Sequence, residues 1–83
     1  MKKILLSIEC PAISNIFDVY VPASLTVKEA ARLLGKGLEE ISNHRYISSG
    51  NEFLCKKEVR ILLKEELMLK DYGIQNGDHI VII

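Results

Sequence analysis

Hydrophobic and polar residues alternate over the first part of the chain. Within residues 2–9 (KKILLSIE), every second position from Ile4 to Ile8 is apolar, which is typical of a half-buried strand. Residues 10–15 (CPAISN) carry proline and asparagine and predict a loop. Residues 16–22 (IFDVYVP) alternate again and end on proline, which cannot donate to a strand ladder. The two strands predict an antiparallel hairpin.

The period then changes from strand to helix. Thr26 and Glu29 have the spacing of a capping box, in which each side chain bonds the other residue's backbone. Gly35 and Gly37 interrupt the pattern and cost about 1 kcal/mol each relative to alanine, so we expect a bend or fraying there. Ser42 and Asn43 are expected to end the helix. Apolar residues recur on one predicted helical face: Val27, Ala30, Ala31, Leu34, Leu38 and Ile41.

The second half of the chain is less regular. Residues 44–52 (HRYISSGNE) predict a loop, and residues 53–57 (FLCKK) and 59–63 (VRILL) predict two short strands. Residues 64–73 (KEELMLKDYG) predict a helical turn or an ordered loop that ends at a left-handed glycine. An Asn-Gly turn then leads into a final apolar strand at residues 79–83 (HIVII).

This order of elements predicts an α+β fold, with a mixed sheet of about four to five strands packed on one helix. The final strand is apolar on both faces, so we place it in the middle of the sheet, parallel to the first strand. Ile80 and Ile82 are then expected to face the helix. Val81 and Ile83 are expected to point to the opposite face.

Composition narrows the function. The 83 residues predict a single domain (1–83), and 11 basic residues balance 11 acidic ones. Without net charge, we expect binding to neither nucleic acid nor an anionic membrane. The apolar runs are too short to cross a bilayer, and the first one breaks at Ser7 and Glu9, too early for a signal peptide. We expect a cytoplasmic protein.

The residues that usually carry chemistry do not form a recognisable constellation. Cys10 and Cys55 do not make a disulfide framework, and His44 and His79 lack a partner at metal-ligand spacing. A Cys55–His44 thiolate pair is conceivable, but Cys55 is expected to face the core, where a thiol is inert. We therefore expect no catalytic residue, no cofactor and no metal, and so no enzyme.

The sheet face turned away from the helix is the expected binding surface. We place Leu5, Leu54, Val81 and Ile83 on it, with Lys56 at its rim. An exposed apolar group of this size is typical of a protein–protein interface. Two alternatives stay open: a loop covers this face, or the strand phase is wrong by one residue.

The last segment resembles ubiquitin. In residues 67–83 (LMLKDYGIQNGDHIVII), a leucine, an Asp-Tyr pair and an isoleucine precede the final strand, as they do in ubiquitin-like proteins. The order of elements is likewise that of the ubiquitin-like β-grasp fold. The resemblance implies that Leu69 and Ile74 plug the core and that the Tyr72 hydroxyl ties down the preceding loop.

Over nearly its whole length the chain resembles the YukD/EsaB family, the ubiquitin-like proteins that accompany bacterial type VII (WXG100) secretion systems. Their ending is similar to Leu-x-Asp-x-Gly-Ile-x-Asn-Gly-Asp, which stands here at residues 69–78. The resemblance implies a cytoplasmic accessory or regulator whose partners are secretion-system ATPase or membrane subunits, as a monomer or weak homo-oligomer.

The alternative is a sulfur carrier or protein modifier. That chemistry needs a C-terminal glycine pair, whereas the sequence ends at Ile83 in a predicted strand, as in the YukD/EsaB proteins. We therefore expect a non-conjugated adaptor. A fold-only module or a fragment of a larger protein also stays open.

Overall fold

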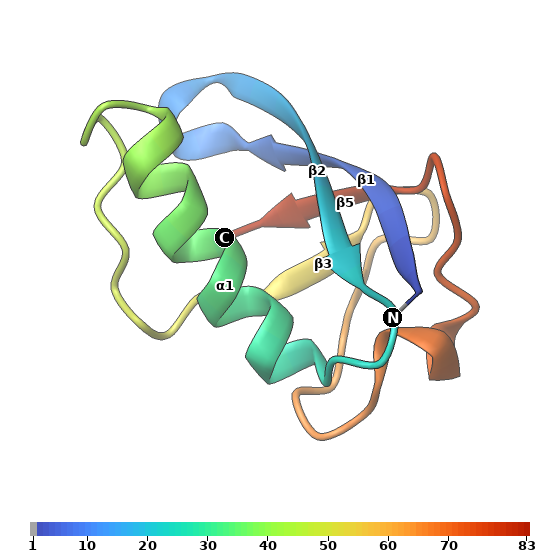
Figure 1. Cartoon of the computed structure of the whole chain (residues 1–83). Helices are drawn as coiled ribbons and strands as arrows, with labels where there is room; N and C mark the ends of the chain where they lie inside the picture. Colours follow the sequence, from blue (N-terminus) through green and yellow to red (C-terminus); the bar gives the residue numbers. More distant parts are fainter. Residues whose placement is uncertain (1) are drawn as a thin grey trace.

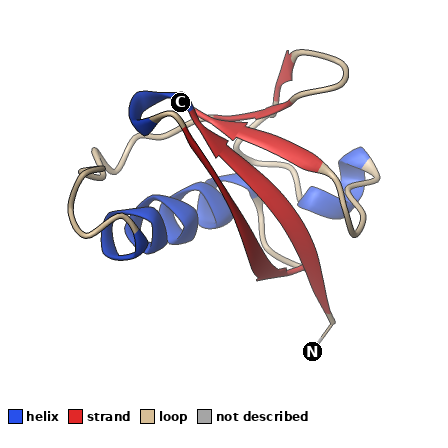
Figure 2. Cartoon of the chain, turned by 90° about the horizontal axis from the view of Figure 1, so that it is seen from above, coloured by secondary structure: helices blue, strands red, loops and turns tan. Residues whose placement is uncertain are grey.

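One helix packs across one face of a five-stranded mixed sheet, as expected (Figure 1). The computed structural model describes residues 2–83. Figure 2 shows the two layers from above, with two short 3₁₀ helices in the connections. The elements are β1 (Lys3–Cys10), η1 (Pro11–Ile13), β2 (Asn15–Pro22), α1 (Val27–Ile41), β3 (Leu54–Lys56), β4 (Ile61–Leu62), η2 (Leu69–Tyr72) and β5 (His79–Ile82).

The strand order is β2-β1-β5-β3-β4. The expectation that the final strand is central and parallel to the first is confirmed, since Ile8 of β1 pairs with Ile80 of β5 in a parallel ladder. On its other side β5 pairs antiparallel with β3. Because β5 has neighbours on both sides and α1 over one face, Ile80 and Ile82 are buried, whereas Val81 on the opposite face is half-buried. β2 and β4 are the margins of the sheet.

The alternation of β1 translates directly into burial. Ile4, Leu6 and Ile8 face α1, and Ile8 has no exposed surface. The same alternation continues to Cys10, which is fully buried as the last residue of β1. Cys10 was expected to be the first residue of a loop. This is wrong, because Cys10 still belongs to the strand and the 3₁₀ helix η1 begins only at Pro11.

The helix begins as the sequence predicts. The Thr26 hydroxyl accepts a hydrogen bond from the Glu29 amide (3.2 Å), and the Thr26 amide donates to the Glu29 carboxylate (3.0 Å). These bonds from Thr26 lower the pKa of the Glu29 carboxyl, because they favour its charged form. The fraying considered at Gly35 and Gly37 does not occur, since α1 runs without interruption through both residues.

One residue of the predicted apolar face of α1 is misplaced. Ile41 is 54% exposed, whereas Leu34 and Leu38 are buried. Ile41 is the final residue of α1, and the chain leaves the helical direction at Ser42. Helical periodicity alone therefore predicted that Ile41 is buried, but the sheet does not cover this face of α1 at its C-terminal end.

The C-terminal segment confirms the three structural roles that the resemblance implied. Leu69 (1% exposed) and Ile74 (6% exposed) lie in the core. The Tyr72 hydroxyl accepts a hydrogen bond from the Lys64 amide at 2.8 Å, which ties η2 to the preceding loop. The Asn76 side chain accepts from the Leu5 amide at 2.7 Å, and Gly77 takes a positive φ of 87° in the turn. These residues of the 69–78 motif therefore serve folding.

Candidate protein-interaction site

The outer face of the sheet, meaning the face opposite α1, is defined by register, because residues paired in a ladder point to the same side. Val81 at the centre pairs with Glu9 on one side and with Cys55 on the other. Cys55 pairs in turn with Leu62 of β4. Further along β5, the backbone of Ile83 exchanges two hydrogen bonds with Phe53 (2.8 and 3.0 Å). These contacts make one continuous apolar group.

We call this group the outer patch: Phe53, Cys55, Leu62, Val81 and Ile83. Its largest members are exposed to solvent, at 61% for Ile83, 54% for Leu62 and 41% for Phe53. Val81 and Cys55 are half-buried between them. Phe53 and Leu62 also line one shallow depression at the end of the patch. The described part of the chain places no loop over these three exposed side chains, so they are free to contact another molecule.

Two polar contacts border the outer patch. The Lys57 ammonium lies 2.7 Å from the Glu9 carboxylate, joining β1 to the turn after β3 across the face. The Ser7 hydroxyl donates to Asp18 at 2.8 Å. Both contacts are exposed, and an exposed ion pair contributes only about 0–1 kcal/mol. These contacts place polar groups beside the outer patch, and the rim of a protein–protein interface is likewise polar.

The five predicted site residues divide into two groups. Val81 and Ile83 lie on the outer face as predicted, and so does half-buried Leu5, which pairs with Tyr20. Leu54 does not: it is 1% exposed and pairs with buried Ile82 beneath the sheet.

The error for Leu54 is the one-residue phase shift left open from the sequence. Residues 53–55 are consecutive apolar positions, so alternation does not decide which of them face inward. The same shift moves Cys55 from the core, where it was predicted, to the outer face. It also removes Lys56 from the outer patch, because Lys56 pairs with buried Ile80. The Lys56 ammonium instead lies 4.0 Å from the Asp78 carboxylate.

Sequence patterns do not indicate that Glu52 is a buried carboxylate, yet it is only 6% exposed. Its Oε2 atom accepts hydrogen bonds from the Tyr46 hydroxyl (2.8 Å), the Ser48 hydroxyl (2.8 Å) and the Ser49 amide (2.9 Å). Its Oε1 atom lies against α1 at Gly35 and has no hydrogen-bond donor among residues 2–83. Glu52 therefore joins Tyr46, Ser48 and Ser49 within the loop, and the Ser48 amide, which donates to the Glu39 carboxylate of α1 at 2.8 Å, attaches the loop to the helix.

The hydrogen bonds around Glu52 also set its protonation. Burial by itself raises the pKa of the Glu52 carboxyl, but the bonds from Tyr46, Ser48 and Ser49 together outweigh it and leave the pKa below the ordinary value of 4.5. Burial, together with the neighbouring carboxylate, raises the pKa of the Tyr46 hydroxyl well above its ordinary value. The pair is a structural anchor in which the carboxylate stays charged and the phenol stays neutral.

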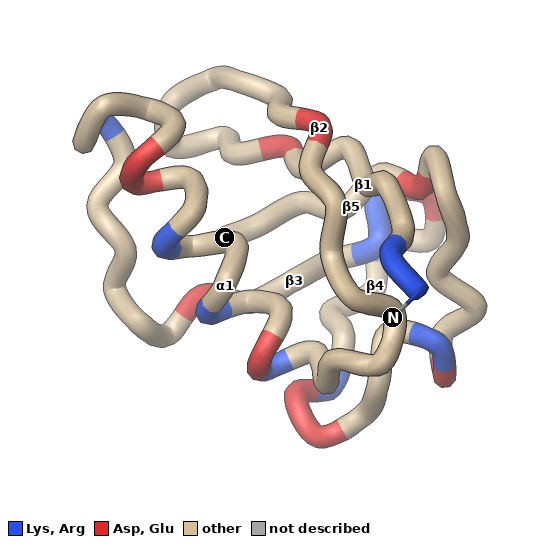
Figure 3. Tube along the Cα trace, in the orientation of Figure 1, with Lys and Arg blue, Asp and Glu red and all other residues tan. Residues whose placement is uncertain are grey.

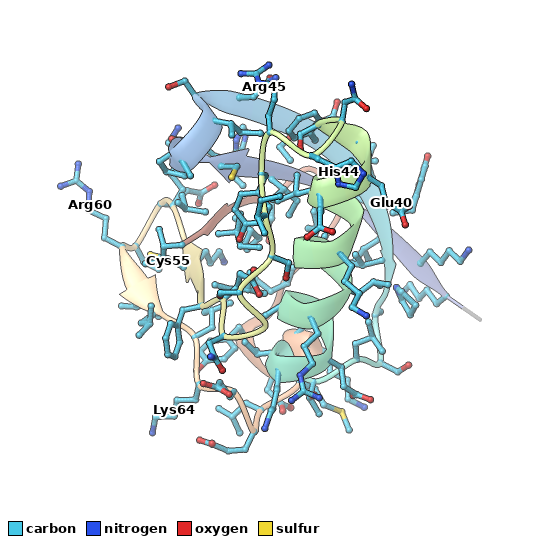
Figure 4. The ribbon with its side chains drawn as sticks, turned by 90° about the vertical axis from the view of Figure 1, so that its left-hand side faces the viewer. Glu40, His44, Arg45, Cys55, Arg60 and Lys64 are labelled. Carbon is cyan, nitrogen blue, oxygen red and sulfur yellow. The ribbon has the colours of Figure 1, made fainter. Side chains whose placement is uncertain are left out.

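The histidines and cysteines do not assemble. His44 is 67% exposed, and its nearest charged neighbour is the Glu39 carboxylate at 3.9 Å. Figure 4 shows His44 beside the end of α1 and Cys55 well apart from it, near β3. Within residues 2–83, no cluster of three or more His, Cys, Asp or Glu side chains is placed to hold a metal ion. No helix in that range is both long and apolar enough to cross a membrane.

The comparisons with known proteins identify the fold. No family model and no curated protein matches the sequence. Among solved structures, the ubiquitin-like domain of an Arabidopsis thaliana protein is 24% identical, with a TM-score of 0.67 over 100% of this chain and 78% of that one. The ubiquitin of Caldiarchaeum subterraneum is 17% identical, with a TM-score of 0.70 over 99% and 92%.

The ubiquitin-like domain of Plasmodium falciparum Dsk2 is 20% identical and has a TM-score of 0.66, over 99% of this chain and 100% of that one. Identities at this level establish architecture and leave the specific role open. Together with the helix on its mixed sheet, the central parallel β5 and the Tyr72 tie, they show that this chain has the ubiquitin-like β-grasp fold.

Proposed function

We propose that this chain is a non-catalytic, non-conjugated ubiquitin-like adaptor that binds other proteins through the outer patch. The observation that carries the proposal is the exposure of Phe53, Leu62 and Ile83 as one contiguous apolar group on the outer face of the sheet. A contiguous group of exposed apolar side chains with polar groups beside it is typical of a protein–protein interface. The mechanism is occupancy of an interface and not a chemical step.

The YukD/EsaB resemblance supports a more specific role. By that resemblance the protein is a cytoplasmic accessory or regulator of a type VII (WXG100) secretion system, and its partners are the ATPase or membrane subunits of the machine. The 69–78 motif contributes little to this choice, because its residues act in the core and the turns. Basic and acidic residues are interspersed along the trace (Figure 3), which agrees with a protein partner more than with nucleic acid.

A binding assay with matched variants tests the outer patch. The immobilised chain is incubated with the purified secretion ATPase and membrane subunits of the same organism. Val81→Asp and Leu62→Asp are expected to remain folded by circular dichroism and to lose the partner. Ile47→Asp is the control, because Ile47 is 67% exposed on the 44–53 loop, away from the patch. Retention of the partner by both patch variants contradicts the proposal.

Two further observations separate the finer role from its alternative. A gene for a WXG100 protein or an FtsK-type ATPase beside this gene supports the secretion role, and its absence counts against that role without touching the adaptor proposal. The sulfur-carrier alternative predicts a C-terminal thiocarboxylate or acyl-adenylate on the native protein. Mass spectrometry of the protein from its own organism detects either adduct.

A further inference from the structure

A pocket opens beside the start of β1, where β5 does not pair with it. The parallel ladder between β1 and β5 begins only at Ser7. Nearer the start of β1, the turn after η2 takes the place of β5: the Leu5 amide donates to the Asn76 side chain (2.7 Å), and the Leu5 carbonyl accepts from the Gly77 amide (2.9 Å). A hollow of about 510 Å³ remains between this turn and the strand.

We call this hollow the basic pocket. Its floor is apolar and its rim is polar. The floor is formed by Ile4, Ala23 and Ile74, and the rim by Lys2, Lys70 and Asn76.

The basic pocket is held in shape by contacts within the chain. Ile4 and Ile74 are only 5% and 6% exposed, so the floor is part of the core. The Ala23 amide donates to the Lys2 carbonyl at 3.0 Å, which fixes one wall. The two bonds to Leu5 fix the opposite wall. A ligand therefore meets a pre-formed surface, and no element has to become ordered when it binds.

The rim of the basic pocket presents hydrogen-bond donors. Lys2 and Lys70 are exposed, and neither ammonium group forms an ion pair within residues 2–83. Asn76 accepts from the Leu5 amide through Oδ1, and its NH₂ group, a donor, has no acceptor in the same part of the chain. A carboxylate suits such a rim, because it only accepts hydrogen bonds and forms its strongest ones with charged donors.

The charge balance around the basic pocket agrees with an acidic ligand. The segments that line it, residues 2–4, 22–24 and 69–78, carry three lysines and two aspartates. Both aspartates are already engaged: Asp71 accepts from the Met68 amide at 2.9 Å, and Asp78 lies 4.0 Å from the Lys56 ammonium. The start of α1 and the 64–67 loop beside it add a nearly balanced set: Lys28, Lys64, Glu29, Glu65 and Glu66. Positive charge is therefore in excess at the pocket, which favours a negatively charged partner.

We propose that the basic pocket binds an acidic segment of a partner protein, in which aspartate or glutamate residues flank one apolar side chain. The apolar side chain lies on the floor, against Ala23 and the edges of Ile4 and Ile74. The flanking carboxylates accept hydrogen bonds from Lys2 and Lys70. The apolar floor favours a protein segment over nucleic acid, whose phosphate backbone has no apolar side chain to place there.

This site is separate from the outer patch and goes beyond the adaptor function proposed for it. Because β1 and β5 run parallel, the start of β1 and the end of β5 lie at opposite ends of the sheet (Figures 1 and 2). Ile4 also faces α1, whereas the outer patch lies on the other face of the sheet. The chain then has two independent contact surfaces, and an occupied basic pocket leaves the outer patch accessible.

The test uses a labelled acidic peptide, GSEDLDEGS, and two matched peptides. GSQNLNQGS removes the charges and keeps the leucine, whereas GSEDSDEGS keeps the charges and removes the leucine. Fluorescence anisotropy is expected to show saturable binding of the first peptide. Each matched peptide is expected to bind at least about ten-fold more weakly, a difference of about 1.4 kcal/mol. The NMR signals of Ile4, Ala23 and Ile74 are expected to shift on binding, and that of Val81 is not.

Charge reversal at the rim tests the residues themselves. Lys70→Glu is expected to stay folded, because Lys70 is exposed, and to weaken binding of GSEDLDEGS at least about ten-fold. Lys36→Glu is the control: it changes the net charge equally at an exposed position of α1 that does not line the pocket, and it is expected to bind normally. The lysine peptide GSKKLKKGS is expected to bind Lys70→Glu more tightly than wild type. If Lys70→Glu does not fold, Lys2→Glu is expected to give the same loss.

Three results would overturn the proposal. The first is unchanged binding of the acidic peptide by Lys70→Glu and Lys2→Glu, or the absence of saturation up to about 1 mM peptide. The second is equal binding of GSEDSDEGS, which would leave the floor without a role. The third is binding of phosphatidylglycerol vesicles or a single-stranded oligonucleotide, lost in Lys70→Glu, without binding of the peptide. Val81→Asp is expected to bind the peptide normally, so failure of the outer patch and failure of the basic pocket are distinguishable.

Discussion

The two helix glycines, Gly35 and Gly37, make opposite demands, and exchanging each for alanine measures the difference. Both substitutions gain about 1 kcal/mol of helix propensity, because glycine is the more flexible residue in the unfolded chain. At Gly37 nothing opposes this gain, since an added Cβ meets no atom within 4 Å. Gly37→Ala is therefore expected to raise the free energy of unfolding by about 1 kcal/mol.

At Gly35 the added Cβ would lie 2.9 Å from Oε1 of Glu52 and 2.8 Å from the Ser48 hydroxyl. These atoms are side-chain ends, but the Glu52 carboxylate is fixed by three hydrogen bonds on its other oxygen. Moving it away weakens at least one bond to a charged group, which is worth about 1.5–3 kcal/mol. Gly35→Ala is thus expected to unfold more easily than the wild type, by about 0.5–2 kcal/mol after the propensity gain.

The comparison of the two variants is sharper than either alone, because the propensity term cancels. The free energies of unfolding should differ by about 1.5–3 kcal/mol, measured by urea denaturation followed by circular dichroism. For a domain of this size, that difference corresponds to roughly 6–24 °C in Tm. If Gly35→Ala proves as stable as Gly37→Ala, the assignment of Glu52 as a rigid anchor against α1 is wrong.

Four further outcomes follow from the same contacts. Glu52→Gln should reduce stability most above about pH 4.5, since the folded pKa of Glu52 is lowered and its contribution is lost as pH falls through that pKa; a difference from wild type that is constant between about pH 7 and pH 2 in urea titrations would refute this. Tyr72→Phe should cost about 1 kcal/mol by leaving the Lys64 amide without its acceptor, and no change in the denaturation midpoint would show that water replaces the hydroxyl. Leu54→Asp should abolish folding because Leu54 is 1% exposed, whereas Leu62→Asp at 54% exposure should not, and near-equal circular dichroism melts would contradict the inward phase of β3. Ile41→Ser should change the free energy of unfolding by less than about 0.5 kcal/mol, and a larger loss would place Ile41 in the core after all.

Local signals predicted the elements that short-range physics controls. The capping box at Thr26 and Glu29 forms within one turn, so the sequence alone is enough to find it. The strict alternation of β1 allows only one assignment of its residues to the two faces of the sheet, because polar Ser7 and Glu9 cannot share the core with Ile8. Leu69, Ile74 and Tyr72 were assigned through resemblance, and the structure gives them the expected burial and hydrogen bond.

The candidate site was only partly predictable. Val81, Ile83 and Leu5 follow from strands whose phase is fixed by neighbours, and they lie on the outer face. Phe53 and Leu62 lie on the outer face although the sequence analysis did not place them there. Leu54 and Lys56 were predicted to lie there and do not. Each of the consecutive residues Phe53, Leu54 and Cys55 is compatible with either face of the sheet. The phase of β3 is therefore set by its pairing with β5 and not by its own composition.

The sequence by itself determined the order of elements and the turns of the 69–78 segment, because each depends on the period, cap or turn chemistry of residues close in the chain. The central position of β5 was inferred from the apolar residues on both of its faces, and its pairing with β1 and β3 confirms it. Only the tertiary structure decided which side of β3 faces solvent, why Gly35 has no side chain and why Ile41 is exposed. Those features depend on which distant residues come into contact, Glu52 on Gly35 above all, and a linear pattern does not contain the distances between its remote parts.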